Sequence, residues 1–148
     1  MATKQSGLKS READGRDTEI RALLQGIQAH QGAMHVIAGD FNALAPGERL
    51  EVGRMPAWIR AMIWVSGRDI ARRTIQTMLD ASYVDAYRQR WPGESGFTFP
   101  TWDPHVRLDY VFLPAREQQR IVRCDVLLDA PRAAEASDHF PLVADISV

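Results

Sequence analysis

Apolar positions early in the chain recur with the period of a helix. Ile20, Leu23, Leu24 and Ile27 stand at i, i+3, i+4 and i+7, which predicts a helix over residues 17–29. Two more helices are predicted over residues 56–65, which open on a proline suited to a first helical turn, and over residues 69–79. Residues 1–16 are almost entirely polar and are predicted to form a flexible arm.

Shorter apolar runs in the rest of the chain predict strands. They cover the residues just before Gly39, a short edge at 97–100, and the stretches 107–113, 121–128 and 142–146. Helices combined with such strands favour the α/β class, with one mixed β-sheet and covering helices. The rest of the chain, residues 17–148, is therefore expected to form one structural unit.

Polar side chains stand beside these strands at three places. Asp40 and Asn42 follow the first strand, where open α/β sheets bind ligands, although both residue types also favour simple turns. Asp109 lies inside an otherwise apolar strand, so its burial requires a histidine, an arginine or a metal as partner. Asp138 and His139 precede the last strand. We expect these five residues to converge at one end of a single sheet.

The composition of the chain excludes several classes of protein. The 148 residues are 45% hydrophobic and 25% charged, as in one ordinary globular domain. A net charge of −1 gives no overall basic surface for nucleic acid. The one cysteine, Cys124, excludes an internal disulfide and a cysteine-based zinc site. The sequence shows neither a spanning apolar run nor a signal peptide, so we expect a cytoplasmic protein.

The three polar clusters together suit metal-assisted hydrolysis of phosphate esters. Carboxylates bind hard cations such as Mg²⁺, or Mn²⁺ in its place. A histidine held by a second carboxylate can donate to phosphoryl oxygens or move protons. An amide can bind a phosphate oxygen or position the attacking water. The alternative is that the clusters are unrelated caps and turns, which leaves Asp109 unexplained.

Five segments, in this order, resemble the endonuclease/exonuclease/phosphatase superfamily, which has a DNase I-like fold. The three polar clusters stand in GDFN at 39–42, RLDYVF at 107–112 and SDH at 137–139, with VDAYR at 84–88 and GFTFPT at 96–101 between them. The superfamily includes abasic-site endonucleases, other nucleases, sphingomyelinases and inositol-polyphosphate phosphatases. The resemblance implies a phosphodiesterase, nuclease or phosphatase acting on nucleic acid, phospholipid or sugar phosphate.

The resemblance also implies roles for the matched residues. Asp40 would activate the attacking water, Asn42 would bind the phosphate, and Asp109 would orient His139, which contacts the scissile phosphate. Asp138, together with Asp40, would hold Mg²⁺ or Mn²⁺. Candidates for further substrate contacts are the residues in and just before the RLDYVF segment, namely Trp102, His105 and Arg107, although loop packing is the favoured role for Trp102.

The superfamily fold is a four-layer αββα sandwich, of which this chain matches the carboxyl-terminal half. The asparagine and the metal-binding glutamate of the amino-terminal half have no counterpart in this sequence. We therefore expect a truncated or separately encoded half that needs the missing half for activity and otherwise self-associates. The alternative is a catalytically inactive remnant or binding module that keeps the fold.

Overall fold

The computed structural model describes residues 17–30, 32–48, 53, 72–129 and 132–148. The predicted arm 1–16 and the predicted helix 56–65 lie outside these residues. The first described helix covers residues 17–26 and continues into the 3₁₀ helix η1 (Ile27–His30). The other helical elements are α3 (Arg73–Asp80), α4 (Ala86–Arg90), the 3₁₀ helix η3 (Ala115–Arg120) and α5 (Ala133–Ala136).

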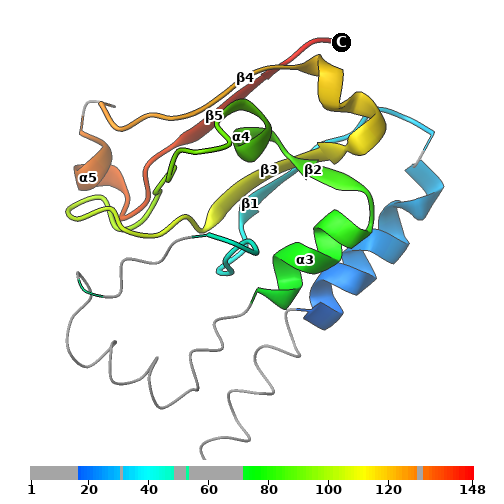
Figure 1. Cartoon of the computed structure of the whole chain (residues 1–148), viewed down its shortest axis with the longest axis horizontal. Coiled ribbons are helices and arrows are strands. Elements are labelled where there is room, and N and C mark those ends of the chain that lie inside the picture. Colours follow the sequence, from blue (N-terminus) through cyan, green and yellow to red (C-terminus); the bar gives the residue numbers. More distant parts are fainter. Residues whose placement is uncertain (1–16, 31, 49–52, 54–71, 130–131) are drawn as a thin grey trace, which may run out of the picture.

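The described strands form two antiparallel sheets. Strands β1 (Ile37–Asp40), β3 (Asp109–Pro114) and β2 (Tyr83–Asp85) form the first sheet in the order β1-β3-β2, and β4 (Ile121–Val126) pairs with β5 (Leu142–Ile146) in the second. The α/β class is confirmed. The strands do not form the expected single mixed sheet, however, because all the strand pairs are antiparallel and the described strands divide into two sheets. Strand β3 ends at Pro114 and η3 follows directly, which turns the chain so that β4 pairs with β5 (Figure 1).

Strand β3 lies between two apolar cores because its side chains alternate from one face to the other. Tyr110 and Phe112 join the core that contains Ile75 and Met78 of α3. Helix 17–26 runs beside α3 and packs against the same core, as the blue and green helices of Figure 1 show. Val111 and Leu113 point into the second core, whose other members come from α4 and β4, namely Ala86, Tyr87, Ile121 and Cys124.

Two local predictions differ from the structure. Residues 83–85 form β2, a strand that the sequence pattern does not predict because three residues are too few to show a period. The predicted edge strand at 97–100 is reduced to a single bridge between Phe99 and Val106. Within the described residues, no helix is both long and apolar enough to cross a membrane.

Candidate active site

The first part of the site is the turn that follows β1. Asn42 has a positive φ of 47°, a conformation that asparagine tolerates better than most residues. Its backbone N–H donates to Asp40 Oδ1 at 2.8 Å, and its side-chain Nδ2 donates to Asp40 Oδ2 at 2.8 Å. Asp40 and Asn42 therefore do form a turn, which was the alternative to a ligand-binding role. The same turn fixes the orientation of the Asp40 carboxylate.

The second part is an aspartate–histidine pair. Asp109 is the first residue of β3 and stands opposite Asp40 in the β1–β3 register. His139 Nδ1 donates to Asp109 Oδ2 at 2.7 Å. The Ser137 hydroxyl accepts from the His139 backbone N–H at 3.0 Å, and the His139 ring lies 4.9 Å from the Phe99 ring centroid. The sequence predicts a histidine, an arginine or a metal as the partner of Asp109, and in the structure the partner is a histidine, His139.

The charges around His139 favour its protonated form. Burial lowers the pKa of His139, but the hydrogen bond to Asp109 and the negative charges of Asp109, Asp40 and Asp138 outweigh burial. The net pKa of His139 is raised above its ordinary value. Asp138 is exposed and its backbone carbonyl accepts from Thr101 N–H at 2.9 Å. The residue thus adds negative charge at the edge of the site.

A surface hollow lies between the two sheets at this point. Its wall is formed by β1, by β3 and by the segment that leads into β5, and includes Gly39, Asp109, His139, Phe140 and Leu142. Asp40 and Asp109 lie at one end of the β1–β3 ladder, as predicted, and Asn42 is bonded to Asp40 there. His139 reaches Asp109 from the segment before β5, so the second sheet also contributes to this end of the first. A small ester could reach His139 and Asp109 from this hollow.

The remaining predicted substrate contacts have different surroundings. Trp102 is 72% exposed, and its ring lies 6.2 Å from that of Phe99, which in turn contacts the His139 ring. His105 is buried, with Nδ1 2.5 Å from the Asp103 carbonyl oxygen. Arg107 has no exposed surface. A surface-bound substrate can reach Trp102 but cannot reach the Arg107 guanidinium.

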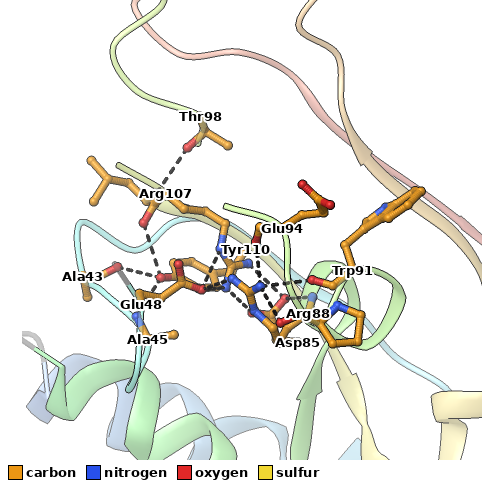
Figure 2. Close-up of polar contacts among 12 residues, drawn as sticks. Ala43, Ala45, Glu48, Asp85, Arg88, Trp91, Glu94, Thr98, Arg107 and Tyr110 are labelled. Atoms are coloured by element: carbon orange, nitrogen blue, oxygen red, sulfur yellow. Dashed lines mark hydrogen bonds and ion pairs between the residues drawn. The ribbon is translucent and has the colours of Figure 1, made fainter. Parts of the chain in front are cut away.

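Arg107 belongs instead to a buried ion-pair cluster (Figure 2). Its Nη2 lies 2.6 Å from Glu48 Oε1 and 2.5 Å from Asp85 Oδ2, and Arg88 Nη2 lies 2.5 Å from the same Glu48 oxygen. Two arginines thus face two carboxylates. Sequence reasoning missed Glu48 and Asp85 because they lie 59 and 22 residues from Arg107 and carry no spacing signal.

The side chains in the described ranges do not make a complete metal site. Within these ranges no three His, Cys, Asp or Glu residues are grouped so that they could hold a metal ion. Both Asp40 oxygens already accept hydrogen bonds from Asn42, and one Asp109 oxygen accepts from His139. Mg²⁺ needs near-octahedral oxygen coordination, so Asp40 and Asp138 alone do not meet that requirement.

Known structures share this fold over about half of their length. An AP endonuclease from Archaeoglobus fulgidus is 24% identical, with a TM-score of 0.65 over 92% of this chain and 55% of that chain. A 3′-5′ exonuclease, NExo, from Neisseria meningitidis is 20% identical, with a TM-score of 0.63 over 87% of this chain and 52% of its own. A Neisseria 3′ phosphatase NExo bound to a product DNA hairpin is 21% identical, with a TM-score of 0.64 and coverages of 87% and 52%.

The other two comparisons concern sequence. Comparison with curated proteins gave no match. The model of the Endonuclease/Exonuclease/phosphatase family matches residues 6–139, a range that runs through the turn after β1 and β3 and ends at His139. The chain therefore belongs to the Endonuclease/Exonuclease/phosphatase family.

Proposed function

We propose that this chain supplies the catalytic residues for hydrolysis of a phosphate ester. The observation that carries the proposal is the 2.7 Å hydrogen bond between His139 and Asp109, with Asp40 paired to Asp109 across the strands. A carboxylate-held histidine and a second, oriented carboxylate are the groups that water attack on phosphorus requires. Family membership supports the same reaction class.

In the proposed reaction each side chain has one role. Asp40, held by Asn42, accepts a proton from water as the water oxygen bonds to phosphorus. The ester P–O bond breaks, and the leaving oxygen takes a proton from solvent. His139, whose Nδ1–H is fixed by Asp109, donates from Nε2 to the phosphoryl oxygens as negative charge grows there. The raised pKa of His139 increases the fraction that carries the donating imidazolium.

We propose a nucleic acid ester as the substrate class. The matched structures are an AP endonuclease, an exonuclease and a 3′ phosphatase bound to product DNA. Trp102 is exposed beside Phe99, where an aromatic ring can stack on a base or pack against a sugar. A phospholipid or sugar phosphate would use the same His139 and Asp40 but would not require stacking on Trp102.

We also propose that hydrolysis depends on Mg²⁺ or Mn²⁺ and on a further polypeptide segment. Asp40 and Asp138 are the carboxylates that this chain would contribute, and other ligands must come from outside the described residues. An amino-terminal half of the family fold, or a second copy of the chain, would supply them. The same incomplete ligand set favours the alternative function, a binding module without catalysis.

The experiment that tests the site is ligand mapping by NMR on the chain itself. A short DNA oligonucleotide with a 3′ phosphate is titrated into labelled protein, with the 3′-hydroxyl oligonucleotide as control. We expect the phosphate to shift the resonances of His139, Asp109 and Asn42, and Trp102→Ala to weaken binding. Shifts confined to another surface, or identical shifts with both oligonucleotides, would contradict the proposed phosphate site.

A further inference from the structure

We infer that Arg107 and Tyr110 are positioning residues that hold the loop after β1 against the start of β3. The inference rests on the proposed function, since the held loop begins with Asp40 and Asn42. The four consecutive residues 107–110 contact this loop or His139, each through a different atom. They thereby fix the distance between the two halves of the site.

The first attachments use the backbone and the tyrosine hydroxyl. Phe41 N–H donates to the Leu108 carbonyl at 2.9 Å. Two residues further along the loop, Tyr110 Oη donates to the Ala43 carbonyl at 3.0 Å and accepts from Ala45 N–H at 2.9 Å. One buried hydroxyl therefore serves as both donor and acceptor for the loop directly after Asn42.

The last attachment is ionic. Glu48 ends the described part of the loop, and its carboxylate is bound by Arg107 Nε at 3.2 Å and Nη2 at 2.6 Å. Asp85, the N-cap of α4, accepts from Arg107 Nη1 at 3.1 Å. Because Arg107 is fully buried, loss of either carboxylate contact would leave part of its charge buried without a partner, which is energetically costly.

Tyr110 and Arg107 support each other. The guanidinium carbon of Arg107 lies 4.3 Å from the centre of the Tyr110 ring, a cation–π contact that stabilises the guanidinium beside the two carboxylates. Burial raises the pKa of Tyr110, so the hydroxyl keeps its proton and continues to donate to Ala43. Asp109, between these two residues in the chain, is left to bind His139. Figure 2 shows the tyrosine hydroxyl directed toward Ala43.

The test removes one hydroxyl and has a matched control. Tyr110→Phe keeps the ring on Arg107 but removes the hydrogen bonds to Ala43 and Ala45. Tyr87→Phe is the control. The Tyr87 ring also contacts the Arg107 guanidinium, at 5.4 Å, but Tyr87 lies in α4 and not beside the loop after β1. The readout is amide hydrogen exchange measured residue by residue. We expect exchange at Ala45 and Asn42 to become at least about tenfold faster in Tyr110→Phe and to be unchanged in Tyr87→Phe.

The pattern of exchange separates positioning from general stability. Amides in the second core, such as that of Cys124, are expected to keep their rates in Tyr110→Phe, since a merely structural role would accelerate them too. Unchanged rates at Ala45 and Asn42, or a uniform increase across both cores, would overturn the inference. Arg107→Lys keeps the charge but loses the forked contact with Glu48 and Asp85, and is expected to accelerate the same loop amides further.

These measurements are independent of hydrolysis. If the loop responds as expected while 3′-phosphorylated DNA binds elsewhere, the positioning role stands and the proposed function fails. If the DNA binds at His139 while the loop amides do not respond, the proposed function stands and the positioning role fails.

Discussion

A single half-buried carboxylate, that of Asp109, explains much of the site. Asp109 starts a strand whose next residues are all buried, and a carboxylate there is stable only with a hydrogen-bonding partner. His139 provides that partner from the far end of the chain and thereby joins the segment before β5 to β3. The same contact orients the imidazole ring, so one hydrogen bond meets a requirement of folding and also the requirement that our proposed mechanism places on His139.

At the residue scale we predict that Asp109→Asn lowers the pKa of His139. The substitution removes the hydrogen bond to a charged oxygen and the nearest negative charge, both of which raise that pKa. The measurement is an NMR titration of the His139 ring in metal-free buffer, with the exposed His30 as internal control. An unchanged midpoint for His139 would contradict the assigned pair.

The same pair has a pH signature in stability. Because the pKa of His139 is raised in the folded state, its contribution is fully present below the ordinary pKa of 6.5 and is lost as pH rises through the folded value. Urea unfolding of the original chain should therefore show this stabilisation in mildly acidic buffer and its loss in mildly alkaline buffer. In Asp109→Asn this pH dependence should shrink.

At the element scale, helix 17–26 is attached to α3 by a hydrogen bond as well as by apolar packing. Thr77 Oγ1 donates to Asp17 Oδ1 at 2.6 Å, and Arg21 Nε donates to Asp17 Oδ2 at 2.9 Å. The hydrogen bond from Thr77 is the largest cause that lowers the pKa of Asp17. The contact joins residues 60 positions apart and places both helices on the same face of the β1-β3-β2 sheet.

We predict that Thr77→Val lowers the free energy of unfolding by about 1 kcal/mol at neutral pH, because the valine cannot donate to Asp17. The pKa of Asp17 is lowered, so the contribution is present above its ordinary value of 3.8 and is lost as pH falls through the folded value. Thr74→Val is the matched control in α3, since Thr74 Oγ1 is buried without a hydrogen-bond partner among the described residues. Urea unfolding should show no loss for this control, and an equal loss in both variants would contradict the assignment.

The elements that sequence reasoning predicted correctly are those with a long local signal. Helix 17–26 has an apolar stripe, and β3 and β4 have apolar runs bounded by turns. Strand β2 has only three residues and no periodicity of its own. The position of Asp109 inside an apolar strand predicts a partner for its carboxylate, which could be a histidine, an arginine or a metal. The role of Arg107, by contrast, could not be predicted from the sequence. The sequence alone does not tell whether an arginine is buried in an ion pair or exposed to bind substrate. For Arg107 the difference depends on Glu48 and Asp85, which are distant in the sequence and meet it only in the folded chain.

At the scale of the whole molecule, the chain spans about half the length of the structures that it matches. Coverage is 55% of the Archaeoglobus fulgidus AP endonuclease and 52% of the Neisseria exonuclease. The described residues nevertheless contain two apolar cores and bring together Asp40, Asn42, Asp109 and His139. These are the groups to which we assign water activation and charge stabilisation, whereas within the described residues no three His, Cys, Asp or Glu side chains are grouped to hold a cation.

We therefore predict that the chain alone releases no phosphate from a 3′-phosphorylated oligonucleotide, with or without Mg²⁺. Joined to the amino-terminal half of the Archaeoglobus fulgidus enzyme, it should hydrolyse the oligonucleotide, and EDTA should abolish the reaction. In the joined protein His139→Ala should reduce the rate by about 10²–10³-fold, the usual cost of losing one donor to the developing negative charge, while His30→Ala should not. Hydrolysis by the chain alone in EDTA, or full activity of joined His139→Ala, would contradict the mechanism. A folded joined protein that binds the oligonucleotide without cleaving it would instead support the binding module.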